Sequence, residues 1–292
     1  MRTLKEVLRD AEDRHVAVGH FNISDIAGFN AVAEAAQELK LPVIIGVSEG
    51  EREFVGVYEA AALVRVVRER KGVEIFLNAD HTHSLARIEE AAKAGFDAVL
   101  FDGSKLLLEE NISQTKKAVE LARSTNPNIF VEGEIGYIGG SSAILKETPE
   151  GAALSPEAFT KPEEAERFVK ETGVDALAPA VGNMHGLLES MVSGDVKKRL
   201  DIELIKKIKE SAKCFLVQHG GSGTADEDFV AGIKAGVNIV HVNTELRLAW
   251  RKGVEEGLAE APDEIAPYKI LPDAVEDIKE VVMARLKLFV GL

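Results

Sequence analysis

Histidines are the residues of this 292-residue chain whose number and spacing most clearly indicate chemistry. The chain has seven, and six of them stand at or just after short apolar segments: His20, His81, His83, His185, His219 and His241. Three carboxylates end segments of the same kind: Asp80, Asp102 and Glu134. Several imidazoles that converge on one place, with a coordination position left open, suit Zn²⁺ acting as a Lewis acid. The pattern therefore predicts a divalent-metal site, with Asp80 as a general base beside His81.

Glycines that follow one of these histidines indicate an anion site. In the segment His219-Gly220-Gly221-Ser222-Gly223, backbone N–H groups can approach a ligand closely because glycine has no side chain. Asn243-Thr244 opens a helical pattern, and a helix N-terminus attracts phosphate. We therefore expect a phosphorylated substrate, the alternative being a flexible turn. For Asp102 a turn is an equal alternative, because Asp102-Gly103-Ser104 is good turn chemistry.

Regularly alternating elements must position these groups. Short β-branched, apolar runs predict eight buried strands, at 16–22, 43–48, 74–80, 98–102, 128–134, 176–181, 214–219 and 239–243. Amphipathic stretches follow them, at 24–39, 58–71, 84–94, 110–124, 162–172, 203–212, 226–235 and 244–258. This order predicts an α/β protein with a (β/α)8 TIM barrel and an extra C-terminal helix at 273–289. A doubly wound open sheet is disfavoured, because no Gly-x-Gly-x-x-Gly follows the first strand.

One long connection interrupts the alternation of predicted strands and helices. Residues 135–161 show little periodicity and include Gly139-Gly140-Ser141-Ser142. Long connections inside compact domains are usually lids or binding loops, so we expect a mobile active-site loop, with a surface insertion as the alternative. We find no linker and no repeat, and we expect residues 1–292 to form a single domain.

Composition limits the partners and the compartment. The net charge of −14 argues against nucleic acid or an anionic membrane as a general partner. The lone Cys214 forms no internal disulfide, and the first ten residues lack the apolar core of a signal peptide, so we expect a cytoplasmic protein. No apolar run approaches the ~20 residues of a membrane span.

In their order and spacing, the motifs resemble the class II (metal-dependent) fructose- and tagatose-bisphosphate aldolase family over nearly the whole chain. The matching segments begin with Asp80-His81 and continue with Phe101-Asp102-Gly103-Ser104, Glu109-Glu110-Asn111-Ile112, Glu132-Gly133-Glu134-Ile135-Gly136, Gly139-Gly140, Gly182-Asn183-Met184-His185-Gly186, His219-Gly220-Gly221-Ser222-Gly223 and Asn243-Thr244-Glu245-Leu246-Arg247. Taken together, these motifs are specific for the family.

The resemblance implies a lyase that cleaves fructose 1,6-bisphosphate to dihydroxyacetone phosphate and glyceraldehyde 3-phosphate. Asp80 is implied as the proton donor and acceptor. The implied metal ligands are His81, His185 and His219, with Asp102 and Glu134 holding a second or alternative metal position. The implied substrate contacts are Asn22, Ser48, Gly186, Gly220, Gly221, Ser222, His241, Asn243 and Thr244. The resemblance also implies a homodimer or homotetramer and Zn²⁺, and it leaves room for another divalent metal and for a monovalent cation.

The chain departs from the family at several points. Thr82 follows Asp80-His81 where the family usually has glycine, His83 adds a further imidazole, and His241 stands in place of an asparagine. Ser141-Ser142 replaces an expected acidic pair, for which Glu147 or Glu150 would be substitutes. Pro267-Tyr268-Lys269 stands near the place of an arginine segment that binds the distal phosphate.

These departures keep several alternatives open. The first is an aldolase for tagatose bisphosphate or another phosphorylated ketose. The second is a metal-dependent barrel hydrolase, which His81-Thr82-His83 suggests. The third is a non-catalytic relative, which Ser141-Ser142 and His241 suggest.

Overall fold

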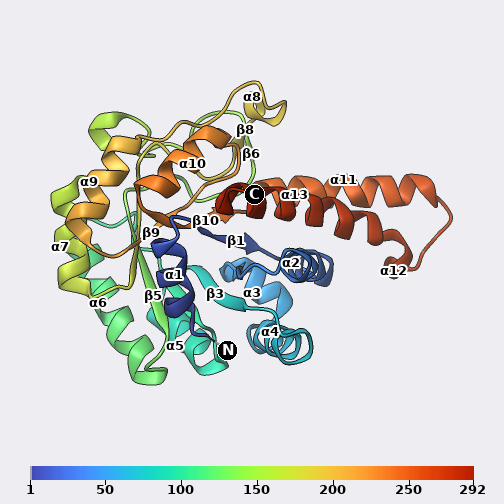
Figure 1. The fold of residues 1–292 in the computed structure, drawn as a ribbon, viewed down its shortest axis with the longest axis horizontal. Helices are drawn as coiled ribbons and strands as arrows, with labels where there is room; N and C mark the ends of the chain where they lie inside the picture. Colours follow the sequence, from blue (N-terminus) through green and yellow to red (C-terminus); the bar gives the residue numbers. More distant parts are fainter. Residues whose placement is uncertain (1) are drawn as a thin grey trace.

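Eight parallel strands close into a barrel in the computed structural model, which describes residues 2–292 (Figure 1). The barrel strands are β1 (Val18–Asn22), β2 (Val43–Val47), β3 (Ile75–Thr82), β4 (Ala98–Phe101), β5 (Phe130–Ile135), β7 (Ala176–Pro179), β9 (Phe215–Gln218) and β10 (Val237–Val242). Their residues are almost all buried, as the continuous apolar runs require when both faces of a sheet are covered. The predicted TIM barrel is confirmed, and each predicted strand lies within a few residues of an observed one.

Helices surround the barrel and connect successive strands. They are α2 (Ile26–Leu39), α3 (Glu49–Val55), α4 (Val57–Lys71), α5 (Leu85–Ala94), α6 (Leu108–Thr125), α7 (Pro162–Thr172), α8 (Glu189–Val192), α9 (Ile202–Ala212) and α10 (Asp226–Ala235). Their boundaries follow local chemistry. The Ser84 side chain accepts a hydrogen bond from the backbone N–H of Arg87 at the start of α5, and Gly95 ends that helix in a left-handed conformation.

An N-terminal helix that the sequence pattern did not predict closes one end of the barrel. Helix α1 (Leu4–Asp13) buries Leu4, Val7 and Leu8 in a core that it shares with the first inward-facing residues of the strands, such as Ile44 and Phe76. A second, larger core lies between the strands and the outer helices. Because α1 covers the amino ends of the strands, the site must open at their carboxyl ends.

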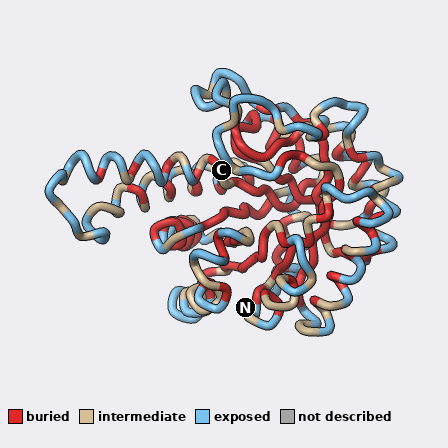
Figure 2. The backbone as a smooth tube through the Cα atoms, turned by 180° about the vertical axis from the view of Figure 1, so that it is seen from behind, coloured by how far each residue is buried: buried red, intermediate tan, exposed pale blue. Residues whose placement is uncertain are grey.

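The last two long helices form an arm that projects from the barrel (Figure 1). Helix α11 (Thr244–Glu260) and the predicted C-terminal helix, α13 (Pro272–Val290), pack against each other, and the short α12 (Pro267–Ile270) lies at the tip. Figure 2 shows that this tip is exposed, whereas buried backbone concentrates in the barrel. Tyr268 and Lys269 therefore lie at the end of the arm, and Lys269 pairs with Glu264 there.

The connection at 135–161 contains more structure than its sequence indicates. The two-residue strand β6 (Ile144–Leu145) pairs in parallel with β8 (Leu187–Leu188), and a 3-10 turn, η1 (Pro156–Ala158), follows. The loop after β5 is thus joined to the loop after β7. A two-residue strand has too few positions to show any period, which explains why the sequence did not predict it. The mobility of the loop stays a prediction.

None of the helices between residues 2 and 292 is both long enough and apolar enough to span a bilayer.

Candidate active site

A cavity of about 520 Å³ opens among the carboxyl ends of the strands. All but one of the predicted site residues line it: Asn22, Ser48, Asp80, His81, Asp102, His185, Gly186, His219, Gly220, Gly221, Ser222, His241, Asn243 and Thr244. Glu134 is the exception, because its side chain is buried beneath His81. Segments that lie far apart in sequence therefore meet where the barrel topology predicts.

A bulge near the end of β3 turns two consecutive side chains toward this cavity. The register with β4 shifts between Ala79 and Thr82, and His81 has a φ of 39°, which is unusual for a residue with a side chain. In a regular strand Asp80 and His81 would point to opposite faces. The buried Arg52 supports the bulge, because its guanidinium donates to the carbonyl of Asp80 at 3.1 Å and to the hydroxyl of Thr82 at 3.0 Å.

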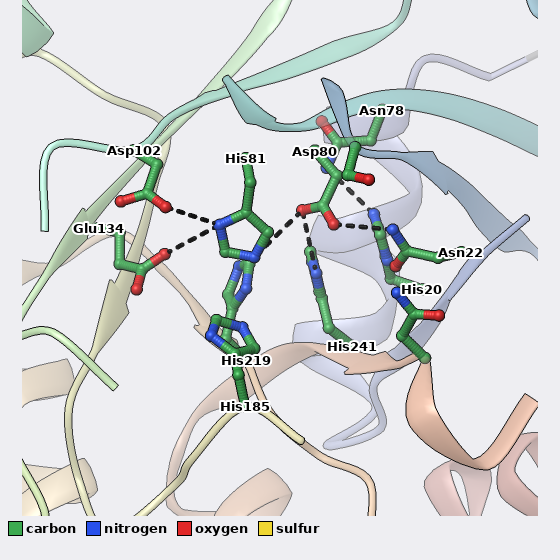
Figure 3. Close-up of polar contacts among 12 residues, drawn as sticks. His20, Asn22, Asn78, Asp80, His81, Asp102, Glu134, His185, His219 and His241 are labelled. Carbon is green, nitrogen blue, oxygen red and sulfur yellow. Dashed lines mark hydrogen bonds and ion pairs between the residues drawn. The ribbon is translucent and has the colours of Figure 1, made fainter. Parts of the chain in front are cut away.

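Three imidazoles are oriented so that each has one ring nitrogen without a hydrogen bond. His81 Nδ1 donates to Asp102 Oδ2 at 2.8 Å, and its Nε2 lies 3.9 Å from Asp80 Oδ1 (Figure 3). His185 Nδ1 donates to the carbonyl of Gly139 at 2.6 Å, which also leaves Nε2 free. His219 Nε2 donates to Glu132 Oε1 at 2.7 Å, and its Nδ1 is buried without a hydrogen-bond partner.

These contacts fit a metal centre. Ligand atoms of the three histidines lie within 4.8 Å of one another. Metal-binding imidazoles usually donate their second N–H to a carboxylate or a carbonyl, which fixes the tautomer and the ring orientation. The orphaned Nδ1 of His219 also needs a partner to offset its burial. The donor set therefore fits a divalent cation of the zinc type.

The electrostatics differ among the three ligands. Burial lowers the pKa of His185 to about 3, so this imidazole is neutral and ready to bind a metal. Burial also acts to lower the pKa of His81, but the carboxylates of Asp80, Asp102 and Glu134 raise it well above its ordinary value. Glu132 has the same effect on the pKa of His219.

A second candidate ligand group shares His81 with the first. It consists of His81, Asp102 and Glu134, with 3.6 Å between His81 Nδ1 and Glu134 Oε2. Burial and the Asp102 charge raise the pKa of Glu134 to about 8. Asp102 also accepts hydrogen bonds from the backbone and hydroxyl of Ser104, so its predicted turn role and its place in the site coexist.

Asp80 has one carboxylate oxygen held and one free. Its Oδ2 accepts from Asn22 Nδ2 at 2.9 Å, whereas the buried Oδ1 has no hydrogen-bond partner. Burial acts to raise the pKa of Asp80, but the nearby histidines and the Asn22 amide lower it below its usual range. Asp80 is therefore a charged, oriented carboxylate beside His81, as a base requires.

His241 stacks on His20. The ring centroids are 3.4 Å apart and the planes are within 2° of parallel. His241 Nδ1 lies 3.5 Å from Asp80 Oδ1, and His20 lies behind the cavity wall, where Asn78 contacts its Nε2. Burial lowers the pKa of His20 to about 4 and that of His241 well below its ordinary value, so both rings are neutral at pH 7.

Several expected substitutes lie outside the cavity. Neither Glu147 nor Glu150 lines it, and neither do Tyr268 and Lys269. His83 does line the cavity with a largely exposed side chain whose Nδ1 contacts the carbonyl of Asp102, but it joins none of the candidate metal groups among residues 2–292. Among the described residues His81 and His83 therefore share no candidate metal group, which a hydrolase site built on His81-Thr82-His83 would need.

Sequence reasoning did not single out several residues that line the cavity, among them Lys105, Tyr137 and Arg247. The Lys105 amine lies over the Tyr137 ring, 5.0 Å from its centroid. The Arg247 guanidinium pairs with the buried Glu51 at 2.8 Å. These residues come from loops and from α11 rather than from strand ends. Their charge and their position after a strand were the available signals.

The proposed anion-binding loop follows β9. Gly220 has a φ of 61°, and a side chain on Gly221 would approach the carbonyl of His241 within 2.5 Å, so the path of the loop requires glycine. Helix α11 begins beside this loop at Thr244, and its N-terminus borders the cavity. The charge of Glu245 in the first turn is balanced by Arg285 at 2.8 Å. The arrangement is suited to phosphate.

Comparisons with known proteins agree with this geometry. The sequence model of a family described as "Fructose-bisphosphate aldolase class-II" matches residues 2–291. A "Probable fructose-bisphosphate aldolase" of Bacillus subtilis is 34% identical over 98% of this chain and 96% of its own, and a "Fructose-bisphosphate aldolase" of Geobacillus stearothermophilus is 33% identical over the same shares. The solved YdjI aldolase from Escherichia coli K12 is 27% identical with a TM-score of 0.81, covering 98% of this chain and 96% of that one.

Proposed function

The chain belongs to the class II fructose-bisphosphate aldolase family, whose members are lyases. From this premise we propose that it cleaves fructose 1,6-bisphosphate reversibly into dihydroxyacetone phosphate and glyceraldehyde 3-phosphate, with Zn²⁺ as its metal. The supporting observation is one cavity that holds three oriented imidazoles beside the free oxygen of Asp80. His81, His185 and His219 would hold the metal.

Asp80 moves the proton in this proposal. In cleavage, its free Oδ1 takes the proton of the C4 hydroxyl while the C3–C4 bond breaks, and the electron pair of that bond passes toward the C2 carbonyl. Zn²⁺ bound to the three imidazoles supplies Lewis-acid polarisation of that ketone. Asn22 orients Asp80, since it donates to the other carboxylate oxygen, and against the effect of burial the neighbouring histidines, His81 above all, lower the pKa of Asp80.

The loop after β9 and the N-terminus of α11 hold the phosphate on C1. Gly220, Gly221 and Ser222 supply the closely approaching backbone, and Asn243-Thr244 supplies the helix terminus. Ser48 and Gly186 border the same cavity, in keeping with their predicted substrate contacts. These contacts orient the ketone end of the substrate toward the imidazoles.

Lys105 is the cation for the distal phosphate. It lines the cavity, and no carboxylate in residues 2–292 lies within salt-bridge distance of its amine, whereas Arg247 is engaged by Glu51. A free cation at the rim suits a second phosphate. We expect Lys105→Met to raise KM for fructose 1,6-bisphosphate about 10-fold or more with a smaller change in kcat.

Two controls make this test specific. The first control is Lys116→Met at an exposed position of α6, which should leave KM unchanged. The second is fructose 1-phosphate, which lacks the distal phosphate and should have the same KM with wild type and with Lys105→Met. An equal rise in KM for both substrates would contradict the assignment of Lys105.

The direct test of the activity is a coupled assay that detects trioses from fructose 1,6-bisphosphate. Tagatose 1,6-bisphosphate, the C4 epimer, presents the same phosphates and ketone and belongs in the same assay. Triose release from fructose 1,6-bisphosphate is the expected result. Release from the tagatose epimer alone would reassign the substrate, and release from neither would refute the proposed function.

The proposal includes an oligomer in the cytoplasm. The arm exposes large apolar side chains at Leu258, Ile265 and Tyr268, which suit contact with a second copy of the chain. Sedimentation is expected to give two or four times the chain mass of 31.5 kDa. The lone, partly buried Cys214 is compatible with a reducing compartment.

A further inference from the structure

Lys198 is a buried cation that the proposed reaction does not use. It lies between α8 and α9, and only 4% of its surface is exposed. No salt bridge within residues 2–292 involves its amine. A buried ammonium group is costly unless other groups replace its hydration, so its surroundings need an explanation.

Four backbone carbonyl oxygens surround the Lys198 Nζ. The distances are 2.6 Å to Met184, 2.7 Å to Gly186, 3.0 Å to Gly220 and 2.6 Å to Ser222. Burial lowers the pKa of Lys198 to about 7 and Glu245 opposes this shift, while hydrogen bonds from the ammonium to carbonyl oxygens favour its charged form.

The four carbonyls make a cage suited to a spherical monovalent cation. An ammonium group has three N–H donors, which is one fewer than the carbonyls that converge on it. Rings of backbone carbonyls are the groups that replace the hydration shell of K⁺ in proteins. Gly186 and Gly220 contribute two of the carbonyls from left-handed conformations, with φ of 75° and 61°.

The cage joins the two loops that carry metal ligands. Met184 and Gly186 flank His185, and Gly220 directly follows His219, with Ser222 two residues further on. The Lys198 backbone also bonds to the second loop, since its N–H donates to Gly223 and its carbonyl accepts from Ala225. The amine thus links the loops of His185 and His219, alongside the Asn183 amide, which donates to the carbonyl of His219 at 3.1 Å.

We propose that Lys198 is a positioning residue that takes the place of a bound monovalent cation and locks the His185 and His219 loops together, so that the protein needs no K⁺ or Na⁺. Its effect on catalysis rests on the proposed function, whereas the carbonyl cage itself does not.

The test is to remove the amine from the carbonyl cage and to offer monovalent cations in its place. Lys198→Ala removes the amine, Lys198→Met fills the space with an uncharged chain, and the neighbouring exposed Lys197→Ala is the matched control. Each protein is stripped of divalent metal, and its thermal unfolding is followed as KCl, NaCl or NH₄Cl replaces tetramethylammonium chloride at constant ionic strength.

We expect the melting temperature of Lys198→Ala to rise by about 5 °C as K⁺ or NH₄⁺ binds to the folded state. Wild type, Lys197→Ala and Lys198→Met should not respond. With Zn²⁺ restored, cleavage by Lys198→Ala should be at least about 10-fold slower than wild type in tetramethylammonium and recover most of that loss in K⁺.

Three results would overturn the inference. One is a Lys198→Ala protein that matches wild type in tetramethylammonium. Another is a Lys198→Ala protein whose melting temperature and cleavage rate fall and are not raised again by any monovalent cation. The third is wild-type activity that rises several-fold with K⁺, a measurement that does not require any variant to fold. A wild type without aldolase activity, together with a K⁺-stabilised Lys198→Ala, would refute the proposed function and leave the cage assignment intact.

Discussion

At the scale of single residues, Asp80 is the group on which the proposed chemistry depends most. We expect Asp80→Ala to lower kcat/KM by about 10²–10⁴-fold, because a positioned general base contributes roughly that much. Zinc content should stay at the wild-type level, because His81, His185 and His219 are unchanged. Metal analysis and the coupled assay on the same sample measure both quantities.

Asp80→Asn is the matched variant, because it keeps the shape of the side chain and loses only the basic oxygen. Its rate should be as low as that of Asp80→Ala. A rate within a few-fold of wild type in either variant would mean that another group moves the proton.

Protons compete with a metal for two of the three imidazoles. A histidine must be neutral to bind, and neighbouring carboxylates raise the pKa of His81 and of His219, whereas burial lowers that of His185. Zinc affinity should therefore fall as the pH falls from 8 to 6, by up to about 100-fold per pH unit while both imidazoles take up protons. Competition with a chromophoric chelator measures this dependence.

Glu132→Gln separates the two contributions. The neutral amide removes the charge that raises the pKa of His219, so the pH dependence should become shallower. An affinity that is equal at pH 8 and pH 6 in wild type would show that neither imidazole is protonated in that range.

The sequence supplied most of the site at this scale because strand ends of a barrel share one face. Lys105, Arg247 and Lys198 were missed, since they reach the site from loops and from a helix. The orientation of the imidazoles could not be predicted either, because it is set by distant parts of the chain. Glu132 accepts from His219, and the carbonyl of Gly139 accepts from His185.

At the scale of elements, most regular segments were predictable, with helix α1 (Leu4–Asp13) as the exception, and the short segments were not. Eight strands and the long helices follow from hydrophobic periodicity. The bulge at Asp80-His81 depends on Arg52 from α3, and the two-residue ladder of β6 and β8 depends on pairing across distant loops. Neither leaves a periodic signal in the local sequence.

The loop at 135–161 is the element in which we expect motion. Its two ends are held, because the carbonyls of Ile138 and Gly139 accept hydrogen bonds from His185 and the backbone N–H of Thr160 donates to Ala180. Residues 140–152 have fewer attachments to other segments, namely the ladder of Ile144 and Leu145 with β8 and one bond from Arg247 to the carbonyl of Ser142. Limited proteolysis of the metal-free protein should cut first within this segment. Zn²⁺ with dihydroxyacetone phosphate should slow the cut, and identical cleavage with and without ligands would count against an active-site lid.

At the scale of the whole molecule, barrel closure brings together groups from opposite ends of the chain. Asn22 on β1 contacts Glu51, which in turn pairs with Arg247 on α11. Parallel β1 and β10 lie side by side and place His20 against His241. The alternation of strands and helices predicts this closure.

The most direct test is cleavage of fructose 1,6-bisphosphate before chelation, after chelation, and during stepwise return of Zn²⁺. We expect activity to vanish with the chelator and to return at about one equivalent of zinc per chain, because two of the other three candidate metal groups share His81 or His219 with the group of His81, His185 and His219. Full activity in protein shown to be free of metal would contradict a metal-dependent aldolase built on these three imidazoles.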